Sequence, residues 1–231
     1  MTMFRTRSHP RAARNAAKAS LAAVAAIAAS ASGALAHPHV WVTVEATVDY
    51  DKGTVVGLTH KWTFDEMYTA MAIQGLDTNN DGTYDRKELA ELAQVNIDGL
   101  KEFDYFTFAK LGDASQPFSP PTDYWLEYNN GQLSLHLKTP LQKPVLAEAE
   151  GLSFAIYDPS YFIAFDMAKA NPVRVSEGAP AGCAASLEVP VEDAELAKKL
   201  GDALQVGPTG NVGTDLGAAV TKSINVSCPK S

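Results

Sequence analysis

The chain is organised around residues 77–88, which read Asp-Thr-Asn-Asn-Asp-Gly-Thr-Tyr-Asp-Arg-Lys-Glu. This stretch fits the calcium loop of an EF-hand. Side-chain or carbonyl oxygens stand at every ligand position of such a loop, on Asp77, Asn79, Asp81, Thr83, Asp85 and Glu88. Gly82 occupies the position where the loop must turn sharply. Because Ca²⁺ takes about six to eight oxygen ligands and this spacing supplies them, the sequence predicts a calcium site here.

The residues on both sides of the loop repeat at helical spacing and predict a helix before it and a helix after it. The apolar positions are Phe64, Met67, Tyr68, Met71, Leu89, Leu92, Ala93, Ile97 and Leu100. We therefore expect an EF-hand inserted at about residues 64–101. The alternative is an acidic, Asn-rich surface turn between two helices.

Two features depart from the usual EF-hand. Tyr84 occupies the eighth position, where a branched aliphatic residue is usual, and the chain contains no second loop of this kind. EF-hands usually pair through this position. The loop is therefore expected either to pack on another part of the chain or to pair between chains, and a structural calcium is favoured over a sensor.

Residues 1–36 have the composition of a secretory signal peptide. They contain five basic residues and no acidic residue, then the apolar run 21–29 and the ending Ala-Leu-Ala at 34–36. The alternative is an uncleaved membrane anchor, but the run is short and rich in alanine. We expect cleavage after Ala36 by the general export route, which leaves residues 37–231 as a single periplasmic domain.

Cleavage makes the chain more acidic. The whole chain has a formal net charge of −8, and losing five basic residues leaves −13 for the mature protein. This charge argues against nucleic acid and anionic membranes as partners. No other segment is long and apolar enough for a transmembrane helix, so no direct membrane insertion is expected after cleavage.

Most of the mature chain has the alternating pattern of β-strands. Valines and an alanine stand at every second position of 40–48, and a turn at 51–53 leads into a second strand at 54–63. Further strands are expected at 105–111, 123–128, 132–139, 152–157, 162–167, 173–176, 184–189 and 223–227, with an Asn-Gly hairpin turn at 130–131. The predicted fold is α+β: an antiparallel, β-rich, sandwich-like domain that carries the inserted EF-hand.

Three histidines suggest a transition-metal site. His37 and His39 lie at the expected new N-terminus, and His60 lies on the second strand of the hairpin. Imidazole is a common ligand of Zn²⁺, Ni²⁺ and Cu²⁺. If residues 51–52 form the hairpin loop, His60 pairs with Thr43 on the first strand. His60 then lies on the same face of the sheet as His39, which is four residues from Thr43 along that strand. A longer loop places His60 on the other face.

The other ligands of such a site are left open by the sequence. The terminal amine and ring of His37 can chelate one ion together, completed by His136, Asp65 or Glu66. The alternative is that these histidines are ordinary strand-face residues at a frayed end. Asp65 and Glu66 also fit the start of a helix, where acidic side chains are favourable.

Cys183 and Cys228 are the two cysteines of the chain, and in an exported protein an even number predicts a disulfide. Each borders a predicted strand, so two neighbouring antiparallel strands would bring them together. Two free thiols, or a soft metal site, are the alternatives. Ser160 lacks the flanking glycines of a nucleophile elbow, and no phosphate-binding loop is present, so the sequence predicts no enzyme.

Several short motifs occur together with the loop. They are Ala-His-Pro-His-Val-Trp-Val at 36–42, His-Lys-Trp-Thr-Phe-Asp-Glu at 60–66, Glu-Phe-Asp-Tyr-Phe at 102–106, Tyr-Asp-Pro-Ser-Tyr-Phe at 157–162 and Cys-Pro at 228–229. In this combination the chain resembles a bacterial family of unknown function labelled as the periplasmic component of an uncharacterised ABC-type transport system. The family is often associated with NicO-type nickel/cobalt permeases, and zinc handling has been proposed for it. The resemblance implies a metal site at His37, His39 and His60, and an inner-membrane permease as partner.

Together these observations predict a periplasmic metal-binding accessory protein of a zinc, nickel or cobalt transport system. Ca²⁺ at residues 77–88 would be structural, and Zn²⁺ or Ni²⁺ would bind at the histidines. One alternative is a calcium-stabilised binding module without a transition metal, in which His136 and the aromatic residues contact a permease or a substrate. The other is a copper-dependent redox enzyme that uses the N-terminal His37.

Overall fold

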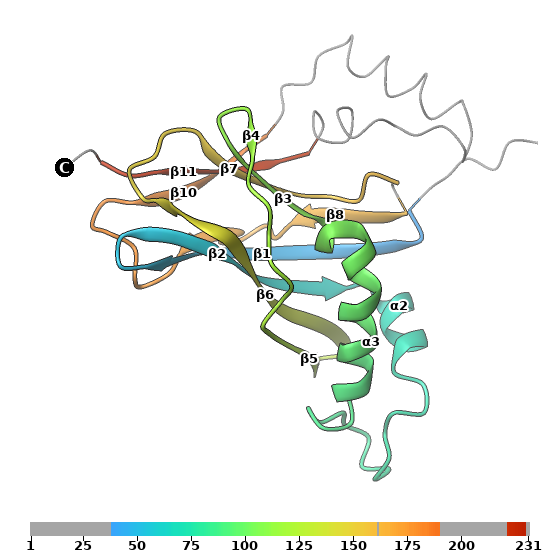
Figure 1. The fold of residues 1–231 in the computed structure, drawn as a ribbon. Helices are drawn as coiled ribbons and strands as arrows, with labels where there is room; N and C mark the ends of the chain where they lie inside the picture. Colours follow the sequence, from blue (N-terminus) through green and yellow to red (C-terminus); the bar gives the residue numbers. More distant parts are fainter. Residues whose placement is uncertain (1–37, 161, 190–220, 230–231) are drawn as a thin grey trace, which may run out of the picture. The chain divides into compact units, whose positions relative to one another are not determined.

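Two β-sheets and two α-helices make up the part of the chain that the structure describes (Figure 1). The structure is a computed structural model that describes residues 38–160, 162–189 and 221–229. These residues belong to one unit, 36–231. The expected signal peptide and His37 lie outside the described residues.

Sheet A has six strands in the order β5-β6-β2-β1-β8, with β9 also paired to β1. These strands are β1 (Val40–Asp51), β2 (Thr54–Phe64), β5 (Asp123–Asn129), β6 (Gln132–Leu146), β8 (Ile163–Met167) and β9 (Val173–Val175). The pairs β1–β2, β2–β6 and β5–β6 are antiparallel, whereas β8 and β9 run parallel to β1. The β-rich α+β class with largely antiparallel sheets is thus confirmed, and the parallel pairing of β8 and β9 with β1 is the departure from the expected arrangement.

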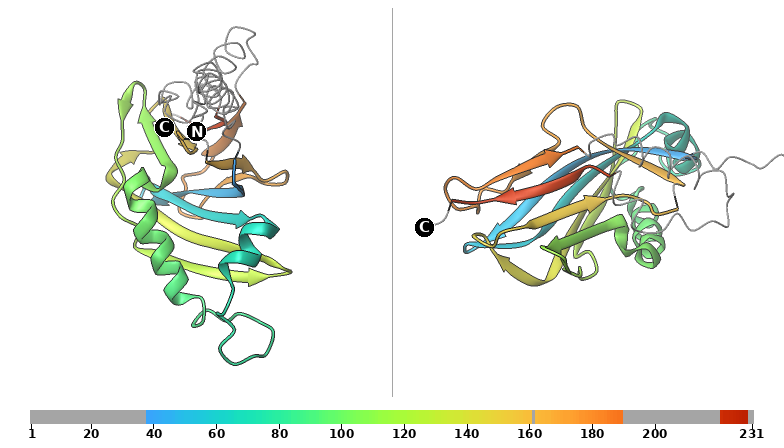
Figure 2. Two further views of the ribbon diagram at one scale, coloured as in Figure 1. Left: turned by 90° about the vertical axis from the view of Figure 1, so that its right-hand side faces the viewer. Right: turned by 90° about the horizontal axis from the view of Figure 1, so that it is seen from above.

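Sheet B has five strands in the order β10-β11-β7-β3-β4, and all its pairs are antiparallel. They are β3 (Thr107–Leu111), β4 (Ala114–Ser115), β7 (Leu152–Ile156), β10 (Ala184–Glu188) and β11 (Ser223–Ser227). Figures 1 and 2 show these strands on one side of β1 and the helices beside β5 and β6.

The core lies between the two sheets and under the helices. Alternate residues of β1, from Val40 to Val48, are buried as their spacing predicts. Trp62 on β2 is 1 % exposed and meets Phe165 of β8 edge to face, with ring centroids 5.0 Å apart. Phe154 of sheet B is equally buried. Both sheets therefore contribute side chains to one apolar core.

Helix α2 (Glu66–Ala72) and helix α3 (Ala90–Leu100) cover the part of sheet A around β5 and β6. The buried Thr69 hydroxyl on α2 accepts a hydrogen bond from the Leu133 amide of β6 at 3.2 Å. The Tyr124 hydroxyl of β5 donates to the Gln94 side chain of α3 at 2.5 Å. In the described residues no helix has the length and apolar character that crossing a membrane requires.

Two hairpin turns explain how the strands of sheet A connect. Lys52 and Gly53 between β1 and β2 have φ of 46° and 78°, and Asn130 and Gly131 between β5 and β6 have 51° and 80°. Positive φ at both central residues is the geometry of the tight turn that joins twisted antiparallel strands. The Asn-Gly turn expected from the sequence is confirmed.

An irregular left-handed turn connects α3 to β3. Asp104, Tyr105 and Phe106 all have positive φ, at 52°, 53° and 47°. Left-handed backbone costs a residue other than glycine about 1 kcal/mol or more, so three in succession are held by their surroundings. Tyr105 and Phe106 are both buried, and the Thr107 hydroxyl donates to the Tyr105 carbonyl at 2.8 Å.

Candidate functional site

The segment from residue 73 to 89 joins α2 to α3 and contains all the predicted calcium ligands. Figure 2 shows it extending beyond the ends of both helices. The carboxylate of Asp77, the first ligand position, accepts the amides of Asp81 at 3.1 Å and Gly82 at 3.0 Å. The carboxylate of Glu88, the last position, accepts the amides of Thr78 at 2.8 Å and Asp85 at 3.1 Å. Both terminal carboxylates therefore fold back over the same short segment.

Two residues let the backbone of this segment turn sharply. Asn80 has φ of 58° and Gly82 has φ of 79°, and no atom lies within 4 Å of where a Cβ on Gly82 would stand. Glycine and asparagine tolerate this left-handed conformation better than other residues. The conformation of Gly82 is the one that its place in a calcium loop requires.

Hydrogen bonds keep two carboxyl groups of the segment ionised. A bond from the Thr83 hydroxyl, followed by one from its amide, lowers the pKa of Asp81 below its ordinary value. The Thr78 hydroxyl does the same to the pKa of Glu88, aided by the Asp85 amide. Both side chains are therefore negatively charged at neutral pH, as calcium ligands must be.

The donor set fits Ca²⁺ in kind and in spacing. Asp77, Asp81, Asp85 and Glu88 supply hard carboxylate oxygens, and Asn79 adds an amide oxygen. Their oxygens are engaged with backbone amides, and within the described ranges no three His, Cys, Asp or Glu side chains converge as they would around an ion. Binding would therefore require these carboxylates to rotate toward a common centre.

Two side chains anchor the segment to the edge strand β5. Tyr84 meets Tyr128 edge to face, with ring centroids 4.8 Å apart. The guanidinium carbon of Arg86 lies 4.6 Å from the centre of the Trp125 ring. The position that couples paired EF-hands thus contacts a β-strand of the same chain, which is one of the two arrangements that the sequence left open.

Trp125 connects this anchor to His136 on β6. The two rings are parallel within 3°, with centroids 4.6 Å apart, and the Nε2 atom of His136 lies 3.0 Å from a Glu127 carboxylate oxygen. Sequence reasoning did not predict the contact between Arg86 and Trp125. No local signal could have shown it, because the two residues lie on different elements.

Asp65 caps the start of α2 and connects this helix to β1. One carboxylate oxygen accepts the Tyr68 amide at 2.9 Å as a helix cap, and the other accepts the Trp41 amide of β1 at 2.8 Å. Glu66 lies in the first turn of the helix, where an acidic side chain is favourable. These contacts fit the alternative helix-start interpretation of both residues.

The structure does not bring His39 and His60 together. His60 pairs with Ala46, not with Thr43 as the expected register had it. The central turn residues are Lys52 and Gly53 instead of the expected 51 and 52, which shifts the register of β2 against β1. An irregularity in β2 before Gly57 then shifts the register a second time. These changes place His60 on the inner face of the sheet. Seven residues along β1 separate its partner from His39, or about 23 Å.

His39 is exposed at the start of β1. Its amide donates to the Phe162 carbonyl at 2.8 Å, and the two rings lie 4.9 Å apart. This contact belongs to the parallel pairing between β1 and β8.

His60 is 1 % exposed, and its Nε2 atom lies 2.9 Å from the Thr139 hydroxyl. That hydroxyl donates to the Leu58 carbonyl, so it accepts from Nε2–H. The Nδ1 atom and the neighbouring Trp62 Nε1 are buried without a hydrogen-bond partner. Burial lowers the pKa of the imidazole from 6.5 to about 3, so the ring is neutral at physiological pH.

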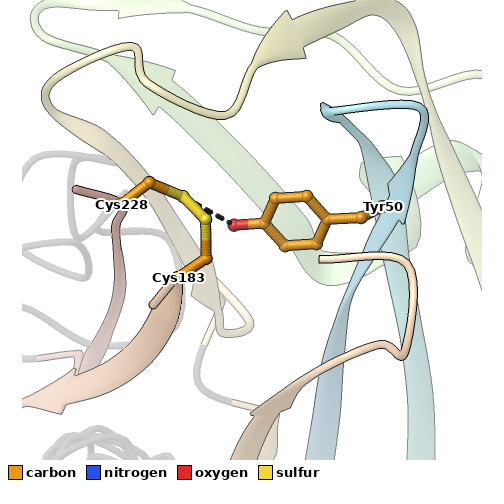
Figure 3. Close-up of a disulfide and its surroundings, with 3 residues drawn as sticks. All are labelled: Tyr50, Cys183 and Cys228. Carbon is orange, nitrogen blue, oxygen red and sulfur yellow. Dashed lines mark hydrogen bonds between the residues drawn. A yellow bond between two sulfur atoms is a disulfide. The ribbon is translucent and has the colours of Figure 1, made fainter. Parts of the chain in front are cut away.

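The predicted disulfide is confirmed between Cys183 and Cys228 (Figure 3). It follows the last residue pair of β10 and β11, Ala184 with Ser227. The Tyr50 hydroxyl of sheet A lies 3.6 Å from the Cys228 sulfur, as the dashed line in Figure 3 marks. The disulfide thus closes one sheet and touches the other.

The fold is that of a β-rich α+β protein in which residues 73–89 join α2 to α3. The chain belongs to the family described as "Protein of unknown function (DUF1007)", whose model matches residues 22–228.

Two proteins have sequences similar to that of this chain. An uncharacterized protein of Haemophilus influenzae is 27 % identical over 145 residues, which cover 62 % of this chain and 69 % of that protein. An uncharacterized 15.5 kDa protein of Spirochaeta aurantia is 31 % identical over 104 residues, which cover 44 % of this chain and 74 % of that protein. No solved structure matches the chain significantly.

Proposed function

We propose that this is an exported calcium-binding protein, and that the segment 77–88 is an EF-hand loop holding α2 and α3 on sheet A. The observation that carries the proposal is the pair of carboxylates at the ends of the loop. Asp77 and Glu88 both fold back onto amides of the same turn. Both carboxylates therefore lie over the same short turn, from which they would rotate toward a common ion.

Charge supports the same proposal. Asp77, Asp81, Asp85 and Glu88 place four carboxylates in one exposed segment, and their mutual repulsion opposes its folding. A bound Ca²⁺ would neutralise part of this charge and replace the hydrogen bonds to amides with metal bonds. Tyr84 and Arg86 would then be held firmly against β5. The role of the ion in this proposal is structural.

The direct test is calcium titration of the purified protein by calorimetry, together with thermal unfolding in calcium, in magnesium and in chelator. With free calcium at about 100 times Kd, we expect a gain of about 2.7 kcal/mol in stability. Glu88→Gln should remove both the binding heat and the gain. Glu91→Gln is the matched control, because it removes an exposed carboxylate from the next helix. Identical unfolding curves in calcium and chelator would rule the proposal out.

A wider role in transition-metal transport is a second part of the proposal, supported by the motif resemblance. In it, the protein is a periplasmic accessory of an inner-membrane NicO-type permease, and Zn²⁺, Ni²⁺ or Co²⁺ binds at the mature N-terminus through His37 and His39. His60 takes no part, because its ring is buried and its Nε2 is engaged with Thr139. The protein acts as a binding protein and not as an enzyme.

Elemental analysis of protein purified from periplasm without chelator or tag tests this second part, with N-terminal sequencing to establish the mature end. We expect one calcium together with zinc, nickel or cobalt, and loss of the second metal in His39→Ala. Copper with an EPR signal would favour the redox alternative. Calcium alone, unchanged after adding the other metals, would favour the calcium-stabilised binding module, which the burial of His60 already supports.

A further inference from the structure

A cavity of about 230 Å³ lies where β8 of sheet A meets the ends of β7 and β11 of sheet B. Its apolar wall is formed by Ile156, Ile163, Phe165 and Met167. Asp158, Asp166 and Lys222 contribute charged groups to the same lining. This volume gives room for a small organic molecule.

Asp158 is the unusual member of this lining because it is an acidic residue that is only 5 % exposed. One oxygen accepts the amide and the hydroxyl of Ser160, at 2.8 Å and 2.7 Å, and the other accepts the Ile163 amide at 2.9 Å. All three donors are neutral. In the described ranges no Lys, Arg or His forms an ion pair with Asp158. The partners of this carboxylate in the described ranges are therefore neutral groups.

The nearby ammonium group is already engaged. Lys222 Nζ lies 2.5 Å from an Asp166 oxygen, and this bond lowers the pKa of Asp166. The pair joins β8 to the start of β11. The described lining of the cavity therefore holds two carboxyl groups and one ammonium group, and that ammonium group is bonded to Asp166 and not to Asp158.

A strained segment supports the wall of this cavity. Phe106, the last residue of the left-handed turn, accepts the Tyr157 amide through its carbonyl at 3.1 Å. Its ring lies 5.5 Å from that of Phe165. Backbone strain persists only where the surroundings maintain it, and it concentrates at binding sites. Here it fixes the residue before Asp158 and an aromatic wall of the cavity.

We propose that this cavity binds a small primary amine with an apolar body. The ammonium group would bond to the Asp158 carboxylate and give it a charged partner, while the apolar part would contact Ile156, Ile163 and Phe165. An anion would face Asp158 and Asp166 while the Lys222 ammonium group is bonded to Asp166, and a neutral molecule would give Asp158 no charged partner. This inference goes beyond the calcium proposal and does not depend on it.

Three probes of one shape test the charge requirement: isopentylamine, isopentyl alcohol and isovalerate. Ligand-detected NMR and calorimetry on protein produced from the full chain should show binding of the amine. The alcohol should bind more weakly than the amine by a factor of about ten or more, because a charge-assisted hydrogen bond is lost. Isovalerate should not bind. Equal binding of the alcohol and the amine, or no binding by any probe, would overturn the proposal.

Two variants test the location. Ala164→Leu adds a side chain within the lining and should abolish amine binding, whereas Ala184→Leu, on the exposed face of β10, should not. Asp158→Asn should weaken amine binding about tenfold and leave alcohol binding unchanged. Because Asp158 also holds the turn before β8, the unfolding temperature of this variant is measured alongside. Amine binding that survives in Ala164→Leu places the site elsewhere and refutes the proposal.

Discussion

His60 is a neutral histidine inside an apolar core, and this makes the protein sensitive to acid. Burial lowers its pKa from 6.5 to about 3, so the native state binds fewer protons than the unfolded state between these values. The neutral His60 ring costs the native state no stability above pH 6.5, where it is neutral in both states. Stability is lost as the pH falls from 6.5 towards 3. We expect the free energy of unfolding to fall by about 1.4 kcal/mol per pH unit in this window from His60 alone.

Urea unfolding at a series of pH values measures this slope. His60→Leu removes the titrating group, so its stability should depend less on pH than that of the wild type. His39→Gln is the matched control because it replaces an exposed histidine. If the wild type and His60→Leu lose stability in parallel between pH 6.5 and about 5, another group governs the acid response.

The place of His60 also shows why single residues are hard to assign from sequence. The alternation of β1 correctly predicted which of its side chains are buried. Which face His60 takes depends on the turn residues and on one irregularity near Gly57, and a shift of one residue reverses the face. The histidine motifs could be found in the sequence, but whether their side chains lie close together could not be derived from spacing.

Gly57 marks a close approach between β2 and β6. A Cβ on this residue would stand 2.4 Å from the Thr139 carbonyl oxygen, which is backbone and cannot rotate away. We therefore expect Gly57→Ala to destabilise the protein by about 2 kcal/mol, within the usual range for overpacking. Gly99→Ala is the contrast, because α3 leaves that site open and alanine favours helix.

Chemical unfolding should therefore shift in opposite directions for these two variants, with Gly99→Ala gaining about 0.5–1 kcal/mol. A neutral Gly57→Ala would mean that the strands separate easily at the irregularity.

The hydrogen bond between α2 and β6 gives a second test at the level of helix and sheet. Thr69→Val keeps the side-chain shape but removes the hydroxyl that accepts the buried Leu133 amide. An unpaired buried amide costs about 1–3 kcal/mol, so unfolding should require less urea. Thr122→Val, at an exposed position, should have little effect. A loss no greater than in that control would show that water replaces the hydroxyl.

The helices and most strands were predictable because each carries its own periodic pattern. The strands expected at 123–128 and 223–227 correspond to β5 and β11, and the Asn-Gly turn between β5 and β6 forms as expected. The parallel pairing of β8 and β9 with β1 was not predictable. It joins segments more than a hundred residues apart, and no local pattern specifies the direction of such a pairing.

Arg86 illustrates the same limit in the candidate calcium segment. The ligand spacing is visible in one short stretch, whereas the strand on which the segment packs is specified only by the tertiary fold. The cavity beside β8 was missed for this reason too. Its charged residues, Asp158, Asp166 and Lys222, come from three places in the chain, and no one of them carries a local signal.

At the scale of the whole molecule, sheet A and sheet B are in contact through Tyr50 and the disulfide. The Tyr50 amide of β1 donates to the Ser176 hydroxyl at 2.9 Å, and its hydroxyl reaches the Cys228 sulfur. Burial raises the pKa of Tyr50, which keeps the phenol neutral beside the sulfur. The disulfide thus stabilises a contact between sheets in addition to the β10–β11 pair that it closes.

Removing this disulfide should therefore lower the stability of the whole molecule. It closes a loop with a sequence separation of 45 residues, for which chain entropy alone gives about 4 kcal/mol. The double variant Cys183→Ser, Cys228→Ser should unfold at lower urea than the oxidised wild type, and reduction of the wild type should give the same shift. Tyr50→Phe keeps the disulfide and removes only the phenol hydroxyl, so its loss should be smaller. If the double variant is no less stable than Tyr50→Phe, the two sheets hold β10 and β11 together without the covalent bond.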